Sequence, residues 1–305
     1  MRRTPEPGMV TYKRIRVKTA LSKSGLYDLD YAYNPYVGCF HGCVYCYARA
    51  YVRDEEVSRN WGTVVYIKEN ILEVLREEVK RKPRGVVGVS TLTDPYQPIE
   101  AGEGLTRRGI QVLLRGNFKV SIQTKSPLVT RDIDILKSYV SHVDVGFTIT
   151  ILDPDVSRLI EPNAPPPAER IKALREVSRA GIPTWIFIGP IIRDLNDSRE
   201  NLEEIITLAV ETGSKVYYDY LHTKPGIRDS MKHLIEKNPN MLAISPRWIN
   251  TVESRIQDLC RKYLVDCKAA FPREEKTRQS KLTQYLERGQ NEKNKSLFTP
   301  RSGSP

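Results

Sequence analysis

The chain has 305 residues, of which 40% are hydrophobic, and this is enough apolar material for a sizeable folded core. Its 48 Lys and Arg residues outnumber its 37 Asp and Glu residues, so the formal net charge is +11. With this composition and only five cysteines, the sequence excludes an intrinsically disordered chain and a small disulfide scaffold.

The excess of positive charge lies at the two ends of the chain. Residues 1–23 hold seven basic side chains and one acidic side chain, and residues 268–305 hold nine and four. The stretch 24–267 is therefore neutral, with 32 side chains of each sign. We expect a neutral folded body with two cationic arms, and such arms are suited to contacts with the phosphates of DNA or RNA.

The sequence carries no pattern that is typical of membrane insertion or export. No run approaches the roughly 18 continuous apolar residues of a membrane span, and the basic N-terminus lacks the apolar stretch of a secretory signal. We therefore expect a cytoplasmic protein that does not enter a membrane. In that compartment an odd, clustered set of cysteines indicates a metal or catalytic site before it indicates disulfides.

An alternation of strands and helices is predicted from residue 31 onward. Residues 1–30 are polar, basic and interrupted by Pro and Gly, which predicts an irregular N-terminal arm. Beyond it, short apolar runs alternate with longer segments of helical periodicity, which predicts a parallel α/β sheet with active-site loops after the strands. The apolar runs are residues 33–37, 86–92, 118–123, 143–149, 184–188 and 216–220.

A proline-rich insertion interrupts this alternation. Five prolines lie between residues 154 and 169, so this segment is not expected to be helical throughout. Residues 226–270 are predicted to form a C-terminal helical extension. Residues 271–305 are polar and charged, which predicts a mobile basic tail.

Two cysteines are predicted to share the long helix of this extension, which is expected to run from Ile249 to Cys267. Cys260 and Cys267 would then have Cα atoms roughly 10 Å apart, at ~1.5 Å of rise per residue. That distance exceeds the reach of a disulfide, so both are expected to face the core as free thiols.

The remaining three cysteines form a dense motif after the first predicted strand. Cys39, Cys43 and Cys46 have the spacing C-x3-C-x2-C, so their thiolates can converge on one centre. Three thiolates leave one coordination position open, as in an iron–sulfur cluster with one iron free to bind another molecule. A structural zinc site would need His41 as fourth ligand at a strained spacing, and we regard it as the weaker alternative.

With Tyr45 before Cys46, the motif resembles the signature of the radical S-adenosylmethionine (SAM) superfamily. The wider sequence is similar to the spore photoproduct lyase-related, DNA repair photolyase-like branch over residues 31–225. The motifs that carry this similarity are Tyr33-Asn34-Pro35-Tyr36, Tyr45-Cys46-Tyr47, Thr93-Asp94-Pro95-Tyr96-Gln97-Pro98 and Thr124-Lys125-Ser126.

The resemblance implies a fold, two cofactors and a reaction. It implies a partial (β/α)6 TIM-type barrel with a [4Fe-4S] cluster on Cys39, Cys43 and Cys46. One iron would chelate S-adenosylmethionine, and an electron from a ferredoxin- or flavodoxin-like protein would cleave it to a 5'-deoxyadenosyl radical that abstracts a substrate hydrogen. The cofactors supply this chemistry, and the protein supplies binding and orientation.

The resemblance also assigns roles to individual residues. Thr93 and Lys125 match positions that hold the S-adenosylmethionine carboxylate, and Asp94 lies beside them. Thr150 matches a hydroxyl near the cofactor, and Tyr45 would pack over it. Tyr47 matches a tyrosine proposed to relay hydrogen atoms, which makes it the candidate catalytic residue.

Some of these residues have plainer interpretations, and one position departs from the branch. Lys125 could be a solvated loop lysine, Asp94 could form an Asp-Pro turn and Glu100 could cap the following helix. In spore photoproduct lyase a strand-two cysteine donates the final hydrogen, whereas Thr91 stands there in this chain. A hydroxyl is a poor hydrogen-atom donor, so the resemblance does not imply thymine-dimer repair by the same route. His41 is expected to turn outward or to bind a cluster sulfide.

Three functions are compatible with these features. The first is a lyase-like radical SAM enzyme acting on a nucleic acid. The second is the same chemistry on a small molecule or a protein, with arms that only confer solubility. The third is a non-catalytic zinc or electron-carrier module with nucleic-acid-binding arms. Oligomeric state, product and the fate of S-adenosylmethionine are not determined by the sequence.

Overall fold

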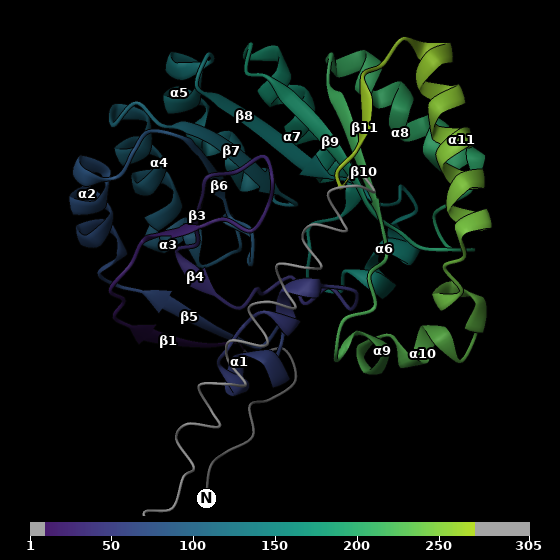
Figure 1. Ribbon diagram of the computed structural model, residues 1–305, viewed down its shortest axis with the longest axis horizontal. Coiled ribbons are helices and arrows are strands. Elements are labelled where there is room, and N and C mark those ends of the chain that lie inside the picture. The colour runs from purple at the N-terminus through teal and green to yellow at the C-terminus, as the bar shows by residue number, and fades with distance from the viewer. Residues whose placement is uncertain (1–9, 272–305) are drawn as a thin grey trace, which may run out of the picture. The chain divides into compact units, whose positions relative to one another are not determined.

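The computed structural model describes residues 10–271, which include an open sheet of parallel strands wrapped by helices (Figure 1). Within these residues, adjacent strands of the series run parallel in chain order, as the sequence predicts. The series comprises β3 (Tyr31–Tyr33), β6 (Val86–Val89), β7 (Lys119–Thr124), β8 (Val143–Thr148), β9 (Thr184–Ile191) and β10 (Lys215–Tyr220).

The ends of this sheet are extended and not joined to each other. Strand β2 (Leu21–Lys23) pairs antiparallel with β3 at one end, and β11 (Cys267–Ala269) adjoins β10 at the other. The full order is β11-β10-β9-β8-β7-β6-β3-β2, so among the described residues the barrel is left open. This is the partial TIM-type barrel expected from the sequence.

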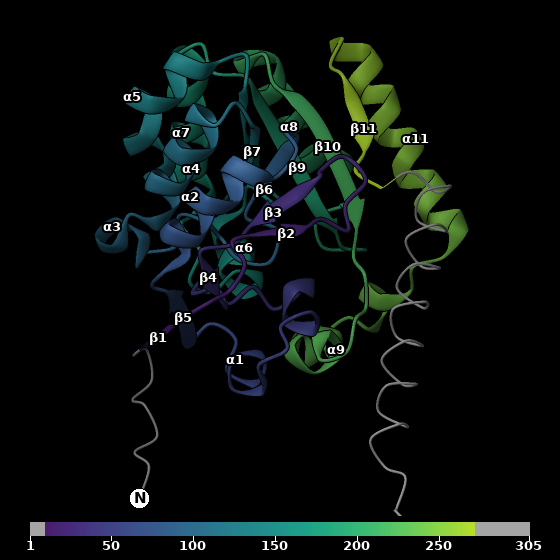
Figure 2. The ribbon, with the colours of Figure 1, turned by 60° about the vertical axis from the view of Figure 1, so that its left-hand side comes forward.

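Amphipathic helices cover the outside of the barrel (Figures 1 and 2). Helix α4 illustrates the cause, since Ile110, Leu113 and Leu114 lie on its buried face at helical spacing. Burial of such a stripe against the sheet is what stabilises a helix of this length. The covering helices are α2 (Ile71–Arg81), α4 (Leu105–Arg115), α5 (Ile133–Leu136), α7 (Pro167–Arg179), α8 (Arg199–Thr212) and α11 (Pro246–Tyr263).

A second, smaller sheet lies outside the parallel series. Its strand order is β1-β5-β4, formed by β1 (Thr11–Ile15), β5 (Val64–Lys68) and β4 (Tyr36–Val37). The short elements that remain connect the larger ones. They are η1 (Tyr47–Ala50), α1 (Glu55–Arg59), α3 (Glu100–Glu103), η2 (Pro127–Asp132), η3 (Lys137–Tyr139), α6 (Pro154–Ile160), α9 (Ile227–Ser230), α10 (Lys232–Ile235) and η4 (Pro239–Leu242).

The prediction of an irregular arm over residues 1–30 is wrong for its described part. Strands β1 and β2 lie there, and both escaped the sequence pattern because their side chains are mostly exposed and polar. The predicted first strand, 33–37, is likewise divided between β3 and β4. Pro35 separates them, since proline has no amide hydrogen to continue a ladder. Residues 1–9 lie outside the described part.

The prediction that the last helix runs to Cys267 is also wrong. Helix α11 ends at Tyr263, where Leu264 adopts a left-handed conformation with φ 56°. The chain reverses into β11, which brings the Cα atoms of Cys260 and Cys267 to 6.2 Å, and the two cysteines form a disulfide. The earlier distance of roughly 10 Å assumed an uninterrupted helix. Except for Phe271, the predicted tail 271–305 lies outside the described residues.

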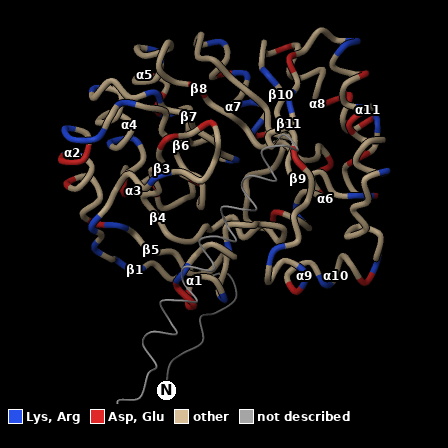
Figure 3. The backbone as a smooth tube through the Cα atoms, viewed as in Figure 1, with Lys and Arg blue, Asp and Glu red and all other residues tan. Residues whose placement is uncertain are grey.

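Basic and acidic residues are interspersed along the described backbone (Figure 3). This agrees with the neutral balance of residues 24–267. The proline-rich insertion consists of helix α6, an irregular stretch and the start of α7, as expected. No helix of the described residues has the length and apolar character needed to cross a membrane.

Candidate active site

Three free cysteines occupy one loop that follows β4. Cys39 and Cys43 are buried, and Cys46 is partly exposed. The loop starts at Gly38, whose φ is +86° and where a Cβ atom would lie 2.6 Å from the carbonyl oxygen of Val64. Only glycine fits there, so the sequence Gly38-Cys39 determines how the loop enters the site.

The three thiols lie close enough to interact electrostatically. Negative charge on Cys43 or Cys46 raises the pKa of Cys39, although burial is the larger cause. Burial raises the pKa of Cys43 to about 12, and the nearby cation of Lys125 opposes this rise. The described residues contain no group of three His, Cys, Asp or Glu side chains arranged to hold a single metal ion. A cubane cluster binds each thiolate to a different iron, so it does not need donors that meet at one point.

The Thr93–Gln97 segment holds the cysteine loop from the neighbouring strand. Thr93 donates a hydrogen bond through Oγ1 to the carbonyl of Gly38 at 2.6 Å. Gln97 donates to Thr93 Oγ1 at 2.9 Å and accepts from the amide of Phe40 at 2.9 Å. The hydroxyl of Thr93, predicted to bind a carboxylate, is thus engaged with the cysteine loop.

Asp94 joins three loops through its buried carboxylate. It accepts hydrogen bonds from the amide of Tyr96 at 2.9 Å, from the hydroxyl of Thr124 at 2.7 Å and from the amide of Lys125 at 2.8 Å. The first bond is the Asx turn that an Asp-Pro sequence favours. His41 turns inward, with Nδ1 3.4 Å from the carboxylate, so the first of its two expected placements, outward, is wrong. The second, a bond to a cluster sulfide, stays a prediction. Burial lowers the pKa of His41 to about 4, which keeps the ring neutral.

Glu161 is the centre toward which the other predicted cofactor residues converge. Tyr45 donates its hydroxyl hydrogen to Glu161 Oε1, and Thr150 does so at 3.3 Å. Lys125 Nζ lies 3.8 Å from the same oxygen and 5.7 Å from the centroid of the Tyr45 ring. The structure therefore gathers Tyr45, Lys125 and Thr150 in one buried cluster beside Cys43.

Arg170 completes this cluster as an ion-pair partner of Glu161. Both side chains are fully buried, and the guanidinium also donates to the carbonyls of Pro165 at 2.7 Å and Thr148 at 3.2 Å. Burial alone would raise the pKa of Glu161, but the cations of Arg170 and Lys125 outweigh it and lower the pKa. Sequence reasoning missed both Glu161 and Arg170. Their only signal in the sequence was that charged residues lie within and directly after the proline-rich insertion.

Tyr47 directly follows Cys46 and begins η1. The residue is 44% exposed, and its hydroxyl donates to the carbonyl of Thr91 at 2.7 Å. Thr91 is itself held by Asn34, whose side-chain oxygen accepts from the amide of Thr91 at 3.0 Å. The candidate relay tyrosine thus contacts the position at which the strand-two cysteine of the branch is missing.

Two further titratable residues, Glu100 and His222, have structural partners. Glu100 accepts from the amides of Thr106 at 2.9 Å and Arg107 at 3.2 Å, so it caps the first turn of α4, as the plainer interpretation expects. His222 lies 2.8 Å from the carboxylate of Asp219 and is half exposed. Neither residue joins the Glu161 cluster.

The C-terminal extension covers the cysteine loop. Ser230, in α9, donates its hydroxyl hydrogen to the carbonyl of Val44. Cys43 and Tyr45 belong to the same apolar cluster as Ile227 and Met231. Residues 227–242 of the predicted extension therefore form part of the site's wall.

One family model and several relatives match this chain. The model of the Radical SAM superfamily matches residues 33–209. The uncharacterized protein MJ0683 of Methanocaldococcus jannaschii is 32% identical over 225 residues, which is 74% of this chain and 82% of that protein. Rv2578c of Mycobacterium tuberculosis is 28% identical over 286 residues, covering 86% of this chain and 83% of the relative.

Solved structures share the fold at low sequence identity. Spore photoproduct lyase complexed with dinucleoside spore photoproduct superposes with a TM-score of 0.64 at 14% identity, covering 85% of this chain and 82% of that one. A variant of spore photoproduct lyase with bound AdoMet and the same dinucleoside gives a TM-score of 0.63 at 14% identity, over 85% and 81% of the chains. At this identity the likeness establishes the fold alone.

Proposed function

This chain belongs to the radical SAM superfamily, and we propose that Cys39, Cys43 and Cys46 hold a [4Fe-4S] cluster that acts on S-adenosylmethionine. One observation carries the proposal: a single loop presents three free thiols at the carboxyl ends of parallel strands. A site with three cysteines leaves one iron of a cubane available for another ligand. A closed structural zinc site would instead require four protein ligands.

The surroundings of the loop fit a sulfur-rich group. Trp61 is 8% exposed and packs in one apolar cluster with Cys39, next to Cys46. Its indole N–H is buried and has no hydrogen-bond partner among the residues that the structure describes. A buried donor without an acceptor is costly, and a cluster sulfur on these thiolates would supply the acceptor.

When bound and reduced, the cluster supplies the electron that cleaves S-adenosylmethionine to a 5'-deoxyadenosyl radical, which abstracts a substrate hydrogen. The protein's own residues bind and orient S-adenosylmethionine. Lys125 supplies a buried cation for the S-adenosylmethionine carboxylate, and Tyr45 and Thr150 line the same cluster. Asp94 and Thr93 position the loops that bear these groups. Helix α9 limits the access of water to the cysteine loop.

We take a nucleic acid as the substrate class. Support comes from the basic arms and from the fold shared with an enzyme that binds a dinucleoside lesion. Tyr47 is the proposed hydrogen relay, because its hydroxyl contacts the backbone of Thr91, where that branch has its donor cysteine. A ferredoxin- or flavodoxin-like electron donor and a cytoplasmic location stay predictions.

Anaerobic reconstitution tests the proposal. The wild-type chain is expected to bind about four irons and to form 5'-deoxyadenosine from S-adenosylmethionine and dithionite. With S-adenosylmethionine deuterated at the 5' position, exchange of label into DNA or RNA would support the substrate class. Exchange into a small molecule or a protein would support the second hypothesis instead. A chain that binds zinc but no iron would overturn the assignment.

Replacement of Trp61 by phenylalanine is expected to make the cluster's reduction potential more negative. The variant removes a hydrogen bond of about 1 kcal/mol to a sulfur, which corresponds to a shift of roughly 40 mV for one electron. Potentiometric titration followed by electron paramagnetic resonance measures this shift. Trp185→Phe is the matched control, because the indole N–H of Trp185 donates to Asp144 and not to the cysteine loop. Equal potentials in Trp61→Phe and wild type would contradict the proposed contact.

A further inference from the structure

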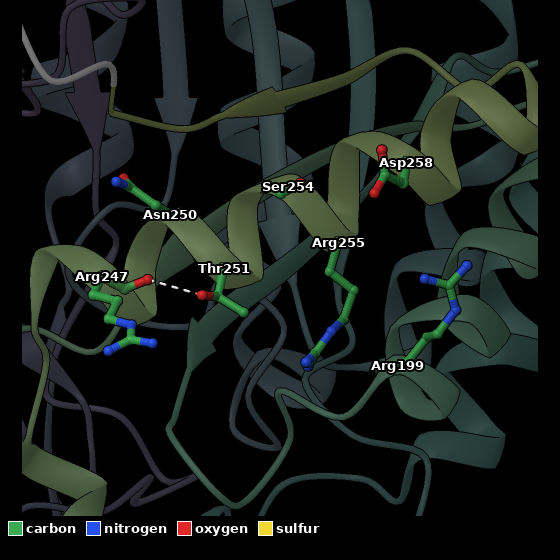
Figure 4. A pocket seen from close by; sticks show the side chains of 7 residues that line it. All are labelled: Arg199, Arg247, Asn250, Thr251, Ser254, Arg255 and Asp258. Atoms are coloured by element: carbon green, nitrogen blue, oxygen red, sulfur yellow. Dashed lines mark hydrogen bonds between the residues drawn. The ribbon is translucent and has the colours of Figure 1, made fainter.

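An open hollow of about 710 Å³ lies between helices α8 and α11 (Figure 4). Its lining includes three arginines and one acid, within a body whose total charge is neutral. Positive charge is therefore in local excess at this hollow. The lining residues are Arg199, Arg247, Asn250, Thr251, Ser254, Arg255 and Asp258.

The hollow is elongated along one face of α11. Six of its lining residues recur at helical spacing from Arg247 to Asp258, and Arg199 approaches from the first turn of α8. Eleven residues of helix span roughly 16 Å at ~1.5 Å per residue. That length exceeds a single phosphate group. We call this feature the α8–α11 groove.

Two of the three guanidinium groups are available to a ligand. Arg199 and Arg247 are exposed, and within residues 10–271 their guanidinium groups form no ion pair or hydrogen bond. The acid of the groove is already engaged, since Asp258 pairs with Arg261. The groove therefore has cations at both ends with polar side chains between them, of which Thr251 donates its hydroxyl hydrogen to the carbonyl of Arg247 at 2.9 Å. Arginine is a side chain that proteins use to bind phosphates.

Arg255 connects the groove to the candidate active site. Its guanidinium donates to the carbonyl of Asp197, and the carboxylate of Asp197 accepts from the indole of Trp248 at 2.7 Å. The preceding residue, Asn196, donates to the carbonyl of Thr150 at 2.9 Å. The loop after β9 thus contacts the groove through Asp197, and it contacts Thr150 of the Glu161 cluster through Asn196.

We propose that the α8–α11 groove binds the phosphodiester backbone of a nucleic-acid strand whose reacting nucleotide enters the active site. This inference rests on the proposed nucleic-acid substrate. An elongated, cationic and polar groove suits a repeated anion without selecting a base sequence. A free phosphate or pyrophosphate has the same chemistry, and the test below separates the two sources.

The test compares matched double variants of the full chain in binding a fluorescent single-stranded DNA of about 20 nucleotides across a salt series. Arg199→Gln with Arg247→Gln is expected to weaken binding on the order of tenfold at about 100 mM salt and to lower the slope of log K against log[salt] by roughly 1.4, for two lost phosphate contacts. Asp258→Asn is expected to strengthen binding. Arg76→Gln with Arg115→Gln is the control, because it removes the same charge from exposed arginines on α2 and α4.

The outcomes separate the groove from the proposed activity. Equal affinities and slopes for the groove variant, the control and wild type would overturn the inference. A second result would also overturn it: the wild-type chain binds inorganic pyrophosphate tightly, and the groove variant loses this binding but binds DNA as the wild type does. Thermal melting checks that each variant is folded. Formation of 5'-deoxyadenosine by wild type, measured separately without DNA, reports on the proposed function whatever the groove does.

Discussion

Cys43→Ala protein is expected to bind almost no iron after anaerobic reconstitution, whereas the wild-type chain should bind about four atoms. Cys43 is a buried thiol whose pKa is raised by burial, and the nearby cation of Lys125 opposes this rise and so stabilises the thiolate. Without Cys43, only the thiolates of Cys39 and Cys46 remain to hold a cubane cluster. Iron analysis and the visible absorption of the cluster measure the loss, and 5'-deoxyadenosine formation should fall below detection.

The disulfide provides a matched control for this experiment. Cys260 and Cys267 are the other cysteines of the chain, and their double replacement by alanine should leave iron content near the wild-type value. Iron loss in the control equal to that in Cys43→Ala would mean that unfolding, and not ligation, removes the cluster. Full iron content in Cys43→Ala would exclude this thiol as a ligand.

Arg170→Met is expected to lower the free energy of unfolding by about 3–5 kcal/mol, because it removes the main partner of a buried carboxylate. Glu161 would lose its ion pair with Arg170 and keep Lys125 Nζ at 3.8 Å as a cationic partner, and the carbonyls of Pro165 and Thr148 would lose their donor. For a chain of this size the melting temperature should fall by roughly 10 °C. Denaturant titration and thermal melting of the reconstituted protein measure the effect.

The cost arises from burial, so an exposed pair serves as control. Arg175 forms a bidentate salt bridge with Glu211, and both side chains are more than 40% exposed. Arg175→Gln should change the melting temperature only slightly, since solvent screens such pairs. If Arg170→Met were no more destabilising than Arg175→Gln, the Glu161 cluster would not be the stabilising centre that its contacts indicate.

The sequence by itself determined the architecture and the cysteine loop. Strands that are buried on both faces require near-continuous apolar runs, so β6 to β10 stand out in the composition of the chain. Gly38, Cys39, Cys43 and Cys46 form a motif within nine residues, and a local motif is visible without knowledge of the fold. The roles of Tyr45, Thr93, Asp94, Lys125, Thr150 and Tyr47 toward a cofactor remain predictions. The strands β1 and β2 were missed, because exposed edge strands lack an apolar pattern.

Only the tertiary structure decided which distant groups meet. Glu161 contacts Tyr45 across 116 positions of sequence and Arg170 from an adjacent helix, and no periodicity encodes such a meeting. A single left-handed residue, Leu264, converts a predicted pair of separate thiols into a disulfide. The α8–α11 groove likewise depends on the packing of two helices from different parts of the chain. The net charge can be counted from the sequence. The partner that each charged side chain meets depends on how residues far apart in the sequence pack together.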